Sequence, residues 1–96
     1  MNNQELKKII CEMVIGDEEL LDQIIILEGD EFADGFIGLS TDNNVVYSYE
    51  KLVESLSKQD DWDETSAIEW LDYNTLRALP YITEGIAPII IHEPIY

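Results

Sequence analysis

The sequence predicts an α+β fold in which N-terminal helices, a β-hairpin, two further helices and a short C-terminal strand form a small sheet covered by helices. Two patterns lead to this prediction: apolar residues recur at helical spacing in four segments, and two strand-like runs flank a turn of polar residues. The chain has 96 residues, 46% of them hydrophobic, which is enough for one core and too little for two. We therefore expect residues 1–96 to form a single domain, with a helical part over 1–28 and an α+β body over 30–91.

The first predicted helix has Asn2 or Asn3 as its N-cap and Gly16 as its terminator. Its apolar stripe is Leu6, Ile9, Ile10 and Met13. Cys11, the only cysteine, lies within this pattern, so we expect a buried thiol and a reducing, cytoplasmic environment. Glu12 interrupts the apolar stretch that a signal peptide needs, and no apolar run reaches the roughly 18 residues of a membrane-spanning helix.

A second helix is predicted to begin at Asp17 as its cap and to end before Gly29. Its apolar stripe is Leu20, Leu21, Ile24, Ile25 and Leu27. The run from Ile24 to Leu27 is rich in β-branched residues, so a strand is the alternative there.

The β-hairpin is the clearest local prediction. A strand over 35–40, a turn over 41–44 and a second strand over 45–49 are each indicated by their residue types. A helix is then predicted over 50–58, and residues 59–63 break it.

Asp63 is expected to cap the last helix. Its inward stripe is Ala67, Ile68, Trp70 and Leu71, while Glu64, Glu69 and Asp72 face away. Pro80 is expected to end regular structure after Leu79, and residues 88–91 read as a short buried strand between two prolines.

The formal net charge is −16, from 21 acidic and 5 basic side chains, whereas a small domain typically carries a charge of magnitude about 2–8. Few of these acids can have a cationic partner. Nucleic acid and anionic lipid are bound through Lys and Arg, so we expect neither a direct nucleic-acid partner nor a membrane partner. Basic protein surfaces are the expected targets.

A calcium loop beginning at Asp30 does not fit. Asp34 and Gly35 match the pattern, but Phe32 occupies the third ligand position and Thr41 replaces the bidentate glutamate. The acids over 60–64 are explained more simply by helix capping than by cation binding.

No catalytic constellation is evident. His92 is the only histidine and has no second ligand at metal-binding spacing. The chain also shows neither an activated nucleophile nor a phosphate-binding loop. We therefore predict no metal, no cofactor and no enzymatic activity.

Arg77, the only arginine, is expected to anchor an internal carboxylate network. Trp70 is expected in the core because of its helical spacing. Trp62 lies among aspartates, and an exposed tryptophan ringed by acids suits a protein interface.

Four runs resemble a widespread group of small uncharacterised proteins of bacterial genomes, prophages and phages: GFIGLS at 35–40, VYSY at 46–49, AIEWLDYNTLRALPY at 67–81 and APIII at 87–91. The resemblance covers residues 30–91, and the N-terminal part departs from it. It brings no established activity, but it implies a setting on mobile elements. Small acidic proteins in that setting often inhibit host defence, and some, including many anti-CRISPR proteins, imitate the phosphates of DNA.

The leading hypothesis is a phage- or prophage-encoded, non-enzymatic binding protein that inhibits or modulates a bacterial nucleic-acid-handling protein by occupying its basic surface, as a DNA mimic would. The candidate partner-binding residues are Asp30, Glu31, Asp34, Asp60, Asp61, Trp62, Asp63, Glu64, Glu69 and Asp72. One alternative is a homo-oligomeric structural or regulatory module that associates through the N-terminal helices. A second alternative is a small metal-dependent enzyme.

Overall fold

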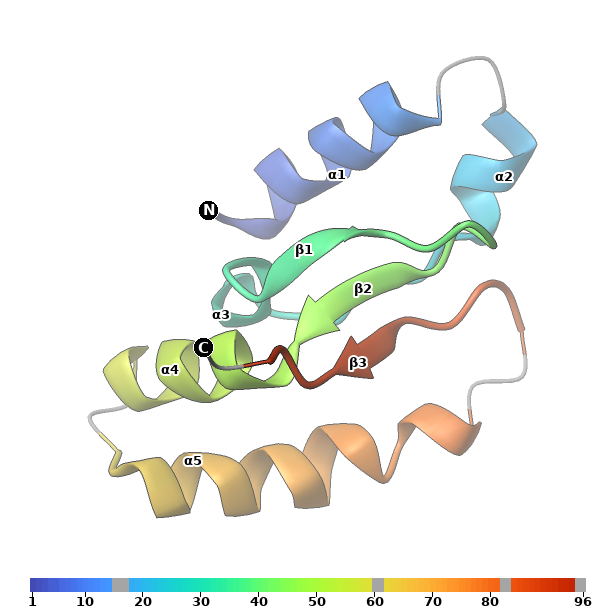
Figure 1. Cartoon of the computed structure of the whole chain (residues 1–96). Coiled ribbons are helices and arrows are strands. Elements are labelled where there is room, and N and C mark those ends of the chain that lie inside the picture. The colour runs from blue at the N-terminus through green and yellow to red at the C-terminus, as the bar shows by residue number, and fades with distance from the viewer. Residues whose placement is uncertain (15–17, 60–61, 82–83, 95–96) are drawn as a thin grey trace.

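The computed structural model describes residues 1–14, 18–59, 62–81 and 84–94, and it confirms the predicted fold class (Figure 1). The helices are α1 (Asn3–Met13), α2 (Glu18–Gln23), α3 (Asp30–Ala33), α4 (Tyr49–Gln59) and α5 (Glu64–Leu71). The strands are β1 (Phe36–Leu39), β2 (Val45–Ser48) and β3 (Ile89–Ile91). A π-helical turn, η1 (Asp72–Leu76), continues α5, and a 3₁₀ turn, η2 (Leu79–Tyr81), follows. α5, η1 and η2 follow one another along the bottom of Figure 1, below the sheet in that view.

The three strands form one mixed sheet in the order β1-β2-β3. β1 and β2 pair antiparallel, with Phe36 opposite Tyr47, which confirms the predicted hairpin. Ser40 closes the turn, since its hydroxyl oxygen accepts a hydrogen bond from the backbone N–H of Asn44 at 3.0 Å. β3 pairs parallel with β2, with Ile90 opposite Tyr47, and α4 and α5 supply the crossover that a parallel pair requires.

One hydrophobic core joins the helices to the sheet. Its buried members are Leu6, Ile10, Phe32, Ala33, Val45, Tyr47, Leu52, Val53, Leu56, Ala67 and Leu71. The buried Tyr47 hydroxyl accepts a hydrogen bond from the backbone N–H of Leu27 at 3.0 Å, which satisfies a polar group inside the fold. Burial raises the pKa of Tyr47 above its ordinary value, because the phenolate form would lose its hydration.

α1 confirms the first predicted helix, and Asn2 is its N-cap: the Asn2 side-chain oxygen accepts a hydrogen bond from the Glu5 N–H at 2.9 Å. The expected burial of Cys11 is wrong, because its side chain is exposed. The buried stripe consists of Leu6 and Ile10, one turn apart, and the next residue lies about 100° further round the helix, toward solvent. The predicted terminator, Gly16, lies outside the described residues.

The second predicted helix is shorter than expected, because α2 ends at Gln23 and does not reach Leu27. Its predicted cap, Asp17, lies outside the described residues. Ile24 forms an isolated parallel bridge with Ile86, whose carbonyl accepts a hydrogen bond from the Ile25 N–H at 3.1 Å. Although apolar residues recur here at helical spacing, the backbone of this β-branched run is bonded to a segment far along the chain and does not continue the helix.

The helix predicted over 50–58 is confirmed as α4. The predicted burial of the last strand is wrong, because Ile89 and Ile91 are 38% and 41% exposed. β3 is an edge strand, and its alternate side chains point to opposite faces, so only Ile90 packs on the core. Pro80 does not end regular structure either, since it lies within η2.

Candidate functional site

The predicted partner-binding residues fall into two described groups. Asp30, Glu31 and Asp34 lie on or just after α3, whereas Trp62, Asp63, Glu64, Glu69 and Asp72 lie along α5. Asp60 and Asp61 lie outside the described residues. α3 and α5 both pack against α4, but the two groups of residues have different surroundings.

The carboxylates at α3 hold the N-terminus against the fold. The Met1 amino group donates to Asp34 Oδ1 at 2.7 Å, and the Asn3 N–H donates to Asp30 Oδ1 at 3.0 Å. Because its charged form has this acceptor, the pKa of the N-terminal amino group is raised above its ordinary value, chiefly by the hydrogen bond to Asp34. These acids therefore have a structural role in closing α1 onto α3.

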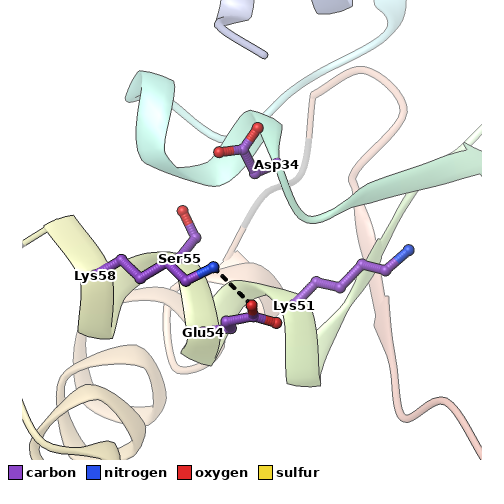
Figure 2. Close-up of a pocket in the computed structure, with 5 residues that line it drawn as sticks. All are labelled: Asp34, Lys51, Glu54, Ser55 and Lys58. Atoms are coloured by element: carbon purple, nitrogen blue, oxygen red, sulfur yellow. Dashed lines mark hydrogen bonds and ion pairs between the residues drawn. The ribbon is translucent and has the colours of Figure 1, made fainter.

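A polar hollow of about 610 Å³, here called the polar pocket, lies between α3 and α4 (Figure 2). It is lined by Asp34, Lys51, Glu54, Ser55 and Lys58. In Figure 2 Lys58 reaches toward Glu54, while Lys51 extends away from that pair. The pocket holds two of the five basic side chains of the chain, so we examined whether it could bind an anion.

The charges of the polar pocket already have partners. Lys58 Nζ lies 2.8 Å from Glu54 Oε1, and Lys51 Nζ lies 3.9 Å from a carboxylate oxygen of Glu93. The first contact raises the pKa of Lys58 and lowers the pKa of Glu54. The Ser55 hydroxyl donates to the Glu31 backbone carbonyl at 2.6 Å. The polar pocket therefore contains a hydrogen bond that connects α4 to α3. Both of its lysines are paired, so it offers no unpaired cation to an anionic ligand.

A second hollow, here called the aromatic groove, runs along α5 and has a volume of about 510 Å³. It is lined by Trp62, Ser66, Glu69, Trp70 and Tyr73. Glu69, Trp70 and Tyr73 lie three, four and seven residues after Ser66, so the four residues line one side of α5 and of the turn that continues it. The inward residues Ala67 and Leu71 are fully buried, which confirms the predicted inward face and turns the groove residues toward solvent.

The N-terminus of α5 is fixed by its cap. Asp63 confirms the predicted cap, since its Oδ1 accepts a hydrogen bond from the Ser66 N–H at 2.7 Å. This hydrogen bond lowers the pKa of Asp63. The cap places Trp62 directly before the helix, where its ring centroid lies 6.1 Å from that of Trp70 at 49°. Trp62 is thus half-buried, and the expectation that it would be exposed holds only in part.

Trp70 forms the base of the aromatic groove. Its ring stacks on the buried Phe32 at a centroid distance of 6.0 Å and an interplanar angle of 26°. The expectation that Trp70 belongs to the core is confirmed in part, because Trp70 packs against the core but is only half-buried and also lines the groove. Asn74, in the π turn, donates its side-chain N–H to the Trp70 carbonyl at 3.1 Å and so fastens the end of α5.

The expected carboxylate network around Arg77 is not what the structure has. Arg77 is exposed, its Cζ lies 5.0 Å from the centroid of the Tyr73 ring, and no ion pair joins it to an acid within residues 1–14, 18–59, 62–81 and 84–94. The Tyr73 ring, four residues earlier, lies within the roughly 6 Å at which a cation and a ring attract.

The acids of α5 and of the turn that follows it, Glu64, Glu69 and Asp72, are exposed and have other contacts than the acids at α3. Glu64 and Glu69 make no ion pair with any residue that the structure describes. Asp72 accepts one hydrogen bond, from the Tyr49 hydroxyl at 3.3 Å. Burial, followed by the charge of Asp72, raises the pKa of Tyr49.

Sequence reasoning nominated Trp62 and Glu69 but missed Ser66 and Tyr73. Glu69, Trp70 and Tyr73 follow Ser66 by three, four and seven residues, and this helical spacing was the available signal. It also missed the contact of His92, whose Nδ1 lies 2.8 Å from Glu50 Oε2. This contact holds the segment after β3 against α4 and lowers the pKa of Glu50.

No family model matches the chain, and no curated protein and no solved structure matches it. No described helix is long and apolar enough to cross a bilayer. The part of the chain that the structure describes contains no group of three or more His, Cys, Asp or Glu side chains that could hold a metal ion.

Proposed function

We propose that this chain is a non-enzymatic binding protein whose acidic α5 face, formed by Glu64, Glu69 and Asp72, docks on a basic surface of a bacterial nucleic-acid-handling protein. The observation that carries the proposal is the aromatic groove, in which three aromatic rings lie beside a carboxylate that has no cationic partner among the described residues. Tryptophan and tyrosine are the residues most often found at the energetic centres of protein interfaces. Charged residues around such a centre provide steering and choice of partner.

The charge of the α5 face suits a site that otherwise binds a polyanion. Glu64, Glu69 and Asp72 are exposed and span about 12 Å of helix at a rise of about 1.5 Å per residue. One strand of B-DNA carries about three to four phosphates over the same rise. A basic surface shaped for a phosphate backbone would therefore meet acids at a comparable density, and the net charge of −16 would accelerate the encounter at low salt.

The resemblance of residues 30–91 to proteins of phages and prophages favours a bacterial cell as the setting. Occupation of a DNA-binding surface would then inhibit or modulate the host protein that carries it. This reading needs no catalytic group on the chain.

Affinity capture from a bacterial lysate at low salt, followed by displacement with double-stranded DNA, tests the proposal. The wild type should retain a DNA-binding protein that the DNA displaces and that high salt releases. The variant Glu64→Gln/Glu69→Gln/Asp72→Asn should lose most of this capture. The matched control Glu5→Gln/Glu12→Gln/Asp22→Asn removes three exposed acids of α1 and α2 and should keep it. Equal loss of capture in both variants would mean that the interaction depends only on the net charge of the chain, and this would contradict the proposal.

Association through the N-terminal helices is the weaker alternative. Leu6 and Ile10, the most buried residues of α1, lie in the core of the chain itself and are not available to a second copy. Size-exclusion chromatography with light scattering on the full chain should give a monomer, and a stable dimer would favour the oligomeric module.

A further inference from the structure

The fold holds two of the three rings of the aromatic groove in place. Trp70 is held from behind by the buried Phe32 ring, and Trp62 packs on Trp70. Tyr73 completes the row and is 68% exposed. A flat side chain entering the groove would therefore meet two tryptophan rings that are already in place. Little conformational entropy would be lost in ordering these two rings.

The groove also offers a negative charge, because a carboxylate lines it together with the rings. Glu69 lines the groove, its side chain is exposed, and no ion pair occupies it within the described ranges. Electron-rich ring faces together with a free carboxylate complement a cation that has its own flat face.

The chain itself contains a contact of this kind. The guanidinium of Arg77 lies over the Tyr73 ring at 5.0 Å, within the roughly 6 Å at which a cation and a ring attract. Tyr73 thus shows that a ring of the groove accepts a guanidinium in water-exposed surroundings.

From these observations we propose that the aromatic groove is a recognition site for an arginine side chain of the protein partner. This inference rests on the proposed function, because the arginine belongs to the basic surface that the α5 face binds. The guanidinium would lie against the rings of Trp62, Trp70 and Tyr73 and donate its paired N–H groups to Glu69. Lysine fits less well, because its ammonium is compact, strongly hydrated and unable to stack or to bind a carboxylate with two parallel hydrogen bonds.

The two tryptophans provide a direct readout. The chain contains only Trp62 and Trp70, and both line the groove, so the intrinsic tryptophan fluorescence reports on this site alone. We would titrate the full chain at low salt with hexa-arginine and hexa-lysine peptides, both with blocked ends and equal charge. The arginine peptide should shift the tryptophan emission and bind about three- to thirtyfold more tightly than the lysine peptide.

Four variants locate the preference. Tyr73→Ala should remove most of it, while Tyr73→Phe, which keeps the ring, should retain it. Tyr81→Ala removes a tyrosine that is 83% exposed and lies outside the described lining of the groove, so it should behave as the wild type. Glu69→Gln tests the same site from its polar side and should weaken the arginine peptide more than the lysine peptide.

The outcomes separate this inference from the proposed function. Equal affinities for the two peptides, with no change in tryptophan emission, would overturn arginine recognition while charge-driven docking survives. Failure of both peptides to bind at low salt would overturn both. An arginine preference that persists in both Tyr73→Ala and Glu69→Gln would place the recognition elsewhere and overturn the inference.

Discussion

The polar pocket and the aromatic groove are hollows of similar size, about 610 and 510 Å³, but their charges are used differently. In the polar pocket each lysine lies beside a carboxylate, and Ser55 is bonded to the backbone of α3. In the aromatic groove Glu69 has no cation among the described residues, and the rings remain accessible. In a chain with 21 acids and 5 bases, the few cations cannot pair with most of the acids, and Glu69 is one of the acids that have no cation among the described residues.

The largest expected effect comes from Phe32, which is 5% exposed and joins the core to the base of the aromatic groove. Phe32→Ala should lower the free energy of unfolding by about 3–5 kcal/mol, because it leaves a cavity beneath Trp70. Urea denaturation followed by far-UV circular dichroism measures this change. Phe32→Leu, which retains most of the volume, should lose less, and a loss below about 1 kcal/mol for Phe32→Ala would contradict the assigned packing.

Ser55 tests the structural role of the polar pocket. Ser55→Ala should lower the free energy of unfolding by about 1–3 kcal/mol, because the Glu31 carbonyl loses its partner at a largely buried position. Peptide binding by the folded variant should equal that of the wild type. A binding defect without a stability defect would show that the polar pocket, and not the groove, contacts the ligand.

The contact between Glu50 and His92 predicts a smaller, pH-dependent effect. The hydrogen bond from His92 lowers the pKa of Glu50 below its ordinary 4.5. A carboxyl group with a lowered pKa in the fold stabilises it at pH values above 4.5, and this stabilisation disappears as the pH falls through the lowered value. The difference in melting temperature between the wild type and His92→Gln should therefore shrink as the pH is lowered from 6 to about 3.

The smallest expected stability effect is at Tyr73. Since this ring is largely exposed, Tyr73→Ala should leave the free energy of unfolding within about 0.5 kcal/mol of the wild type. The same variant should lose most of its preference for the arginine peptide over the lysine peptide. Ser55→Ala should thus change stability but not peptide binding, whereas Tyr73→Ala should change peptide binding but not stability. A strongly destabilised Tyr73→Ala variant would contradict this difference between the polar pocket and the aromatic groove.

Local patterns were sufficient for a large part of the fold. The hairpin, α1 with its Asn2 cap, α4 and the Asp63 cap of α5 each depend on residues close in sequence. A cap or a turn is decided by hydrogen bonds that span three or four residues, so its signature is present in the sequence.

Two of the incorrect predictions have a non-local cause. Ile24 pairs with Ile86, far along the chain, and β3 remains at the edge of the sheet because no fourth strand covers it among the described residues. Neither the pairing of Ile24 with Ile86 nor the edge position of β3 can be recognised from residues close in sequence. For the candidate site, the sequence identified Trp62 and Glu69, but the stacking of Trp70 on Phe32 and the placement of Arg77 over Tyr73 required the folded arrangement.

Chemical-shift mapping of the ¹⁵N-labelled full chain during titration with hexa-arginine tests the central claim most directly. The account predicts the largest shifts at Trp62, Ser66, Glu69, Trp70 and Tyr73, including both indole N–H signals, with Lys51, Ser55 and Lys58 almost unmoved. Shifts spread evenly over the acidic surface, or centred on the polar pocket, would contradict it.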